Sequence, residues 1–333
     1  MLLNSDLFIG FDGGGTKTIC IIGDSQGRII ASAIGASTNL KSRPEEKVKE
    51  VIYQLLDELL QSDQIQMERI KGVFVSTAGG DREEDRKRWQ QWIVEYGIKP
   101  YKLSVANDAV AALAAGTKGQ NGIVLIAGTG SIAYSVSDGL SKPIRVGGWG
   151  YLIGDEGSGY HIGNEALRMI TRSYDGIEDK REAFTKDILE KMGLETAEQL
   201  ITFIYEDPYP RKLIASIADH VITLAERDEP HAAGIIQSAI EQLVHLVIAI
   251  MNKDKESLDY PLVISGGLFQ SDYFRMGFEQ TLRLKGCSLP IILPKYPPVV
   301  GSYMSAIIQS GKTITANMEQ NIDHFWRKKN ESH

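Results

Sequence analysis

The 333-residue chain has few of the residues that mark secreted or metal-binding proteins. Its two cysteines, Cys20 and Cys287, lie far apart and match neither a disulfide framework nor the spacing of zinc-ligating cysteines. The six histidines form no metal-ligand pattern either. We therefore expect reduced thiols, a cytoplasmic location and no metal other than Mg²⁺.

Long apolar runs and clusters of basic residues are also scarce. No uninterrupted apolar run approaches the ~20 residues that span a bilayer, and the first residues lack the basic segment that begins a signal peptide. The net charge is -7, and the longest basic clusters are the triplets 86–88 and 327–329. Nucleic acids are bound by clustered Lys and Arg side chains that neutralise phosphates. The sequence predicts neither a membrane span nor a nucleic-acid partner.

Glycine, in contrast, is abundant, with 33 residues against 11 prolines, whereas ordinary proteins contain ~7% glycine. An excess of glycine favours turns in which the backbone approaches another group closely. The chain has 43% apolar residues, enough to bury a core, and its length corresponds to about two domains.

Two parts of the chain begin with the same pattern of strand, glycine-threonine turn and strand. The first has apolar runs 7–11 and 19–22 around the turn 12–16, and the second has runs 123–127 and 132–136 around the turn 128–130. Their spacing of roughly 110 residues is too long for a solenoid repeat. It predicts an internal duplication in two lobes that share a cleft. The expected lobes are residues 1–118, rejoined by about 301–333, and residues 119–300.

The rest of the chain alternates between strand and helix patterns, which predicts an α/β fold. Further strands are expected at 28–33, 73–77, 103–106, 262–265 and about 290–293. Helices are expected at 44–59, 83–96, 108–115, about 160–173, 180–191, 211–228, 231–252 and from about 301. The clearest helical period is that of Val48, Val51, Ile52, Leu55, Leu56 and Leu59.

The first turn, Asp12-Gly13-Gly14-Gly15-Thr16-Lys17, has the composition of a phosphate-binding turn. Consecutive glycines allow several backbone N–H groups to face one anion. Asp12 ends a strand beside this turn and is placed to hold Mg²⁺, directly or through water. An ordinary hairpin is the alternative. A Rossmann motif is excluded because a strand, and not a helix, follows the glycines.

Three more glycine sites follow, at Gly128-Thr129-Gly130-Ser131, at Gly266-Gly267 after the strand 262–265, and at Gly301. A second hairpin facing the first would clamp a polyphosphate from two sides. The segment Ser310-Gly311-Lys312-Thr313 looks like the end of a Walker A loop, but its leading position holds Ala306 in place of glycine.

In this order, the four sites resemble the phosphate 1, phosphate 2, adenosine and second connecting segments of the actin and hexokinase ATPase superfamily. Ser37-Thr38-Asn39, Asn107-Asp108-Ala109, Gly147-Gly148-Trp149-Gly150 and Gly154-Asp155-Glu156-Gly157-Ser158 are similar to the N-acetylglucosamine kinase branch of the BadF/BadG/BcrA/BcrD ATPase family. The resemblance covers nearly the whole chain. It implies a two-lobed, actin-like fold of ribonuclease H type and an ATP-dependent kinase that phosphorylates the C6 hydroxyl of an N-acetylated amino sugar.

The resemblance also implies a role for each matching residue. ATP would contact Gly13, Gly14, Gly15, Thr16, Lys17, Gly128, Thr129, Gly130, Ala215, Gly266, Gly267 and Gly301. The sugar would contact Asn39, Asp108, Ser131, Ile132, Gly148, Trp149, Gly150 and Asp155, with residues 77–80 in the sugar-side wall. Asp108 would be the catalytic base and Asp12 would serve Mg²⁺. A homodimer is the expected assembly.

Structural alternatives remain for three of these residues. Asp108 is also suited to cap a helix, Asp155 to cap a helix or brace a loop, and Trp149 to fill a core. Two other functions are an activator of a 2-hydroxyacyl-CoA dehydratase, whose iron-sulfur cluster Cys20 and Cys287 do not match, and a non-catalytic sugar sensor. N-acetylglucosamine is the favoured substrate, with N-acetylmuramic acid, glucosamine and glucose as alternatives.

Overall fold

The computed structural model describes residues 5–15, 17–41, 43–62, 65–80, 82–137 and 142–331. The chain divides into two compact units. The first consists of Met1–Gly122, Val136–Lys142 and Ile292–His333, and the second of Ile123–Ser135 and Pro143–Ile291.

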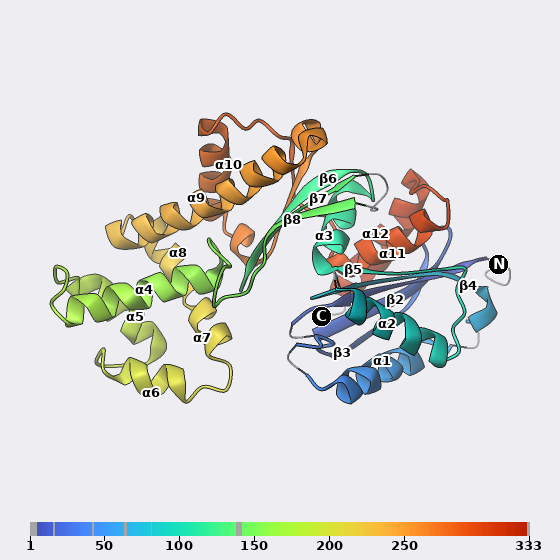
Figure 1. The fold of residues 1–333 in the computed structure, drawn as a ribbon, viewed down its shortest axis with the longest axis horizontal. Coiled ribbons are helices and arrows are strands. Elements are labelled where there is room, and N and C mark those ends of the chain that lie inside the picture. Colours follow the sequence, from blue (N-terminus) through green and yellow to red (C-terminus); the bar gives the residue numbers. More distant parts are fainter. Residues whose placement is uncertain are drawn as a thin grey trace. The chain divides into compact units, whose positions relative to one another are not determined.

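The first sheet is mixed and has helices on both faces. Its strands are β1 (Leu7–Gly13), β2 (Lys17–Asp24), β3 (Ile29–Ala36), β4 (Ile70–Thr77) and β5 (Lys102–Asn107), in the order β3-β2-β1-β4-β5. The first three strands form an antiparallel meander, whereas β4 runs parallel to β1, and β5 to β4. One face carries α1 (Glu45–Leu59) and α2 (Glu83–Glu95), and the other carries α3 (Asp108–Thr117) and α11 (Pro298–Gln309) (Figure 1).

The second sheet repeats this topology. Its strands are β6 (Gly122–Ala127), β7 (Ser131–Ser137), β8 (Lys142–Gly147), β9 (Leu262–Ser265) and β10 (Ile291–Ile292), in the order β10-β9-β6-β7-β8. In each sheet the first strand lies at the centre, the second and third lie on one side of it, and the fourth and fifth lie on the other. The repeated order confirms the predicted α/β fold built from two similar halves.

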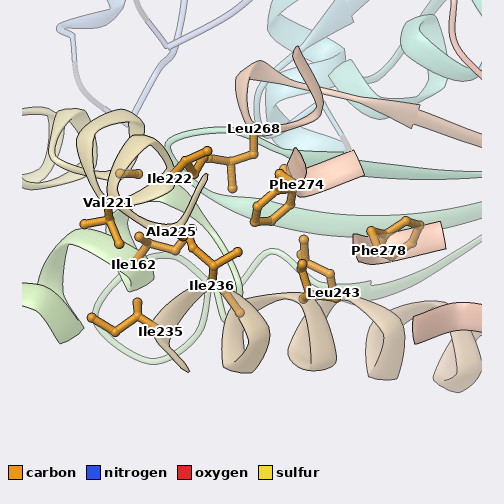
Figure 2. Close-up of a cluster of buried hydrophobic side chains, with 14 of the residues drawn as sticks. Ile162, Val221, Ile222, Ala225, Ile235, Ile236, Leu243, Leu268, Phe274 and Phe278 are labelled. Atoms are coloured by element: carbon orange, nitrogen blue, oxygen red, sulfur yellow. The ribbon is translucent and has the colours of Figure 1, made fainter. Parts of the chain in front are cut away.

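Helices α4 to α10 surround the second core. They are α4 (Gly159–Tyr174), α5 (Glu182–Met192), α6 (Gln199–Tyr205), α7 (Pro210–Ser216), α8 (Ala218–Glu226), α9 (Pro230–Lys253) and α10 (Asp272–Leu284). Figure 2 shows Ile162 of α4, Val221 of α8, Ile236 of α9 and Phe274 of α10 in one buried cluster. By length and hydropathy α9 resembles a membrane span, but its apolar side chains supply much of this core.

The structure corrects the predicted helix over residues 211–228, which is divided into α7 and α8 at Ile217. The division accompanies close packing of α7 on α4. A Cβ atom built on Gly163 of α4 would lie only 2.0 Å from the Ile214 carbonyl oxygen of α7. The sequence patterns did not predict β8, α6, α10 or α12 (Ala316–Glu331).

Helix α11 packs closely on β1 and on α3. A Cβ atom built on Gly10 would lie 2.3 Å from the Tyr303 nitrogen, and one built on Gly301 would lie 2.0 Å from the Ala111 carbonyl oxygen. The helix begins at Pro298, so Gly301 lies inside it and not at its start. Packing against α3 therefore explains why this position is glycine, and its contact with ATP stays a prediction.

Candidate active site

The parallel strands of the first unit bring two predicted carboxylates to the same edge of the sheet. Asp12 pairs in register with Ser76, and the next residues along β1, β4 and β5 are Gly13, Thr77 and Asn107. Asp108 follows directly and begins α3. The carboxyl ends of β1 and β5 therefore place both carboxylates at one end of this unit.

The environment of Asp12 suits a divalent cation. Burial, together with the negative charge of Asp108, raises the pKa of Asp12 to about 7, although Lys17 acts in the opposite direction. A cation here would relieve the repulsion between the carboxylates. No group of three or more His, Cys, Asp and Glu side chains forms a metal cluster among the described residues. A single carboxylate fits Mg²⁺, which keeps several waters and binds substrate phosphates.

The first glycine turn adjoins the predicted sugar residue Asn39. The Gly14 N–H donates a 3.0 Å hydrogen bond to the Lys17 carbonyl and so closes the turn. The Gly14 carbonyl accepts a 3.0 Å hydrogen bond from Ser37 Oγ. Ser37 Oγ in turn accepts a 3.2 Å bond from the Asn39 N–H. Gly15 is exposed at the tip of the turn, and Thr16 lies outside the described residues.

Asp108 does not cap α3. The cap is Asn107, whose Oδ1 accepts a 3.0 Å hydrogen bond from the Ala109 N–H. Asp108 is the first helical residue and is half-buried. The capping alternative for Asp108 is therefore wrong, and its carboxylate lies where the helix dipole favours a negative charge.

The glycine hairpin of the second unit is held by the start of α4. Its Gly128 and Thr129 carbonyls accept hydrogen bonds of 2.7 and 3.3 Å from the N–H groups of Gly159 and Tyr160. The N-cap of α4 is Ser158, whose Oγ accepts a 3.2 Å bond from the His161 N–H. Asp155 is thus not the cap of this helix.

Four predicted ATP-binding residues line one cavity of about 300 Å³ in the second unit. They are Gly128, Thr129, Ala215 and Gly267; the other lining residues are Gly159, Lys212, Ser216, Asp219 and Leu268. Gly266 does not line this cavity, and its contact with ATP stays a prediction; its φ is 107°, and an added Cβ atom would lie 2.2 Å from the Ala127 carbonyl oxygen. It lets the end of β9 approach β6, while Gly267 faces the cavity.

Asp155 is the centre of the predicted sugar loop. It is 3% exposed, has a φ of 64°, and accepts hydrogen bonds from the backbone N–H groups of Ser131 and Gly150. Arg211 Nη2 donates a third bond, of 2.8 Å, to its Oδ2. Burial raises the pKa of Asp155, and Arg211 and the two N–H groups oppose the rise. Asp155 therefore braces the loop, which was one of its structural alternatives. A carboxylate has about four hydrogen-bond acceptor positions, and these three bonds occupy three of them.

The other predicted sugar residues of this unit surround the same loop. The Gly148 N–H donates to the Ser131 carbonyl over 3.1 Å, and a Cβ atom on Gly148 would lie 2.2 Å from Ile132 Cδ1. Trp149 is 64% exposed, with the Arg145 guanidinium 4.8 Å from its ring centroid. This exposure rules out the core-filling alternative for Trp149.

Sequence reasoning missed Arg211 and Lys212, which α7 brings to Asp155 and to the cavity. Once Ala215 is placed near the nucleotide, helical spacing puts Lys212 and Arg211, three and four residues before it, on the same side of α7. That spacing was the signal in the sequence that could have found them.

Two units of equal sheet topology define the actin-like ATPase fold. Residues 9–306 match the BadF/BadG/BcrA/BcrD ATPase family, and the chain belongs to this family, as the motifs predicted. It is 32% identical over 302 residues to the N-acetylmuramic acid/N-acetylglucosamine kinase of Clostridium acetobutylicum, covering 90% of this chain and 97% of that protein.

Two further comparisons agree. The N-acetyl-D-glucosamine kinase of Dictyostelium discoideum is 32% identical over 280 residues, which are 80% of this chain and 86% of that protein. The solved structure of a candidate N-acetylglucosamine kinase from Chromobacterium violaceum matches with a TM-score of 0.69 and 23% identity, over 91% of this chain and 99% of that one. At this identity the structure supports the fold alone.

Proposed function

We propose that the protein is an ATP-dependent kinase that phosphorylates the C6 hydroxyl of an N-acetylated amino sugar, with N-acetylglucosamine as the favoured substrate. One observation carries the proposal: the hairpin 128–131 belongs to both predicted sites. Gly128 and Thr129 line the cavity with Ala215 and Gly267, and the next two residues adjoin the Asp155 loop. The names of the two 32% identical relatives support the same substrate class.

In this proposal the reaction needs mainly positioning and one proton acceptor. A bond forms between the sugar O6 atom and the γ-phosphorus, and the bond from that phosphorus to the β,γ-bridging oxygen breaks. Asp108 accepts the hydroxyl proton as general base, and it begins α3, where the helix dipole favours a negative charge. By the family resemblance, Asn39 and Asp108 also contact the sugar.

The resemblance assigns the remaining contacts as well. The sugar contacts Ser131, Ile132, Gly148, Trp149, Gly150 and Asp155, and ATP occupies the cavity beside Ala215 and Gly267. By the same resemblance, Gly13, Gly14, Gly15, Thr16 and Lys17 contact ATP phosphates. Mg²⁺ at Asp12 would neutralise phosphate charge during transfer.

Three further properties belong to this proposal. The enzyme acts in the cytoplasm, which the two buried, unpaired cysteines support. It forms a homodimer, as the family resemblance implies. N-acetylmuramic acid is a second candidate substrate, because the Clostridium acetobutylicum relative carries both sugars in its name.

The test is a coupled assay of ADP release with N-acetylglucosamine, N-acetylmuramic acid, glucosamine and glucose, followed by phosphorus NMR of each product. We expect phosphate on C6 and the highest kcat/KM with an N-acetylated sugar. ATP consumption that no sugar increases would refute sugar kinase activity. A preference for glucose would refute N-acetylated amino sugars as the substrate class. Protein carrying Asp108→Asn controls for contaminating kinases.

A further inference from the structure

Arg211 in α7 faces the carboxylate of Asp155. Its Nη2 atom donates to Asp155 Oδ2 over 2.8 Å, and its guanidinium carbon lies 5.3 Å from the ring centroid of Tyr151. A Cβ atom built on Gly130 would lie 2.8 Å from Arg211 Nη2 and 2.8 Å from Asp155 Oδ2. The arginine and the carboxylate therefore meet directly against the glycine hairpin.

The two side chains differ in exposure, and this difference indicates what the contact does. The Arg211 side chain is 41% exposed, whereas the Asp155 side chain is 4% exposed. An arginine that is partly in water gains little stability from an ion pair. A buried carboxylate, in contrast, binds a proton unless a nearby positive charge and hydrogen bonds stabilise its anionic form. The main effect of the contact therefore falls on Asp155.

We propose that Arg211 is a positioning residue of the sugar site, which holds the Asp155 carboxylate ionised and oriented to accept a hydrogen bond from a sugar hydroxyl. This inference rests on the proposed sugar kinase function. The N–H groups of Ser131 and Gly150 and the Arg211 guanidinium occupy three of the roughly four acceptor positions of Asp155. The remaining position accepts from the sugar, provided that the carboxylate carries no proton.

The other groups around the pair are tyrosines, so Arg211 is the group that holds Asp155 ionised. Tyr151 in the loop lies under the guanidinium, and Tyr160 in α4 is in edge contact with Tyr151. Burial, Tyr151 and, more weakly, Tyr205 in α6 raise the pKa of Tyr160, while Arg211 lowers it; the net rise keeps Tyr160 neutral at physiological pH. Among the described residues, Arg211 supplies the charge that opposes protonation of Asp155 most strongly.

Helix α7 also borders the nucleotide cavity, through Lys212, Ala215 and Ser216. A change at Arg211 that merely displaced α7 would therefore disturb ATP binding as well as sugar binding. A change that acts through Asp155 would affect the sugar and leave ATP binding nearly constant. The ATP KM thus separates the two explanations.

The test compares Arg211→Gln, which removes the charge, with Arg211→Lys, which keeps it. The buried Nε atom of Arg211 has no hydrogen-bond partner among the described residues, so lysine gives up no bond there. KM values for N-acetylglucosamine and ATP are measured at about pH 6 and about pH 8.5, because any loss of the ionised form of Asp155 is larger at the lower pH. Sugar binding without ATP is measured by calorimetry on the same proteins.

We expect Arg211→Gln to raise the sugar KM about 10- to 100-fold at the lower pH and clearly less at the higher pH. The larger effect at the lower pH follows from the lost positive charge. Without the guanidinium the pKa of Asp155 rises further, so the ionised carboxylate that accepts the sugar hydrogen bond is lost as the pH falls. The ATP KM should change less than about threefold, and Arg211→Lys, which keeps the charge but loses the guanidinium plane over Tyr151, should have a sugar KM between those of wild type and Arg211→Gln. In an Asp155→Asn background, Arg211→Gln should add little.

An equal loss at both pH values, an equal rise of the ATP KM, or additive effects of the two substitutions would overturn the inference. Arg283→Gln removes an exposed arginine that pairs with Glu279 in α10, and it should behave as wild type. If the wild type phosphorylates the sugar and Arg211→Gln is unchanged, only this inference fails. If the wild type neither binds nor phosphorylates any of the sugars, the proposed function fails as well.

Discussion

Asn107 Oδ1 accepts a 3.0 Å hydrogen bond from the Ala109 N–H, so the residue before Asp108 caps α3. The cap and the proposed base are thus adjacent but separate side chains. Substitutions at Asn107 and at Asp108 therefore test stability and catalysis independently.

Asp108→Asn should lower kcat by about 10²- to 10⁴-fold, the range for loss of a general base, with little change in sugar affinity. Thermal unfolding should stay close to wild type because the cap is intact. Asn107→Ala is the matched control: it removes the cap and should cost ~1 kcal/mol of stability. Wild-type turnover in Asp108→Asn would remove this residue from the role of base.

Asp155→Asn should raise the sugar KM by about 10²-fold and the ATP KM far less, because an amide replaces one acceptor oxygen with a donor. Asparagine adopts positive φ at least as readily as aspartate, so the substitution adds no backbone strain at this position. The control is Asp228→Asn, at an exposed aspartate with a φ of 60° in the same unit. Equal rises in both KM values would indicate a structural role for Asp155.

The elements predicted well are those whose signal is local. The residues with helical spacing in α1, from Val48 to Leu59, are the buried ones, because one apolar face repeats over the whole helix. The division between α7 and α8 has another origin. It accompanies the approach of α7 to Gly163 of α4, a contact between residues distant in sequence, and no proline or glycine marks it.

The candidate site shows the same contrast. The hairpin residues Thr129 and Gly130 were predicted because glycine turns between strands are visible in a short window. Arg211 lies 56 residues from Asp155 in a helical segment without a motif, and folding alone brings the two together. The exposure of Trp149 likewise depends on the whole loop, so the sequence left core filling open as an alternative.

The raised pKa of Asp12 predicts how stability changes with pH in Mg²⁺-free buffer. The folded chain binds this proton up to about pH 7, whereas an ordinary aspartate releases it near 3.8, so the wild type loses stability between these values as the pH rises. Asp12→Asn cannot ionise and should unfold about 2 to 4 °C higher at about pH 8, with solvent screening limiting the effect. The difference should vanish below about pH 4. Identical melting curves at all pH values would contradict the raised pKa.

Gly301 and Gly234 provide a matched test of helix packing, because both lie inside helices but in different surroundings. A Cβ atom on Gly301 would lie 2.0 Å from the Ala111 carbonyl oxygen, whereas one on Gly234 would meet no described atom within 4 Å. Gly301→Ala should therefore force α11 and α3 apart and cost about 1–3 kcal/mol in denaturant unfolding. Gly234→Ala should gain about 0.5–1 kcal/mol, because alanine is the better helix former. If Gly301→Ala were as stable as wild type but bound ATP more weakly, nucleotide contact and not helix packing would account for glycine at this position.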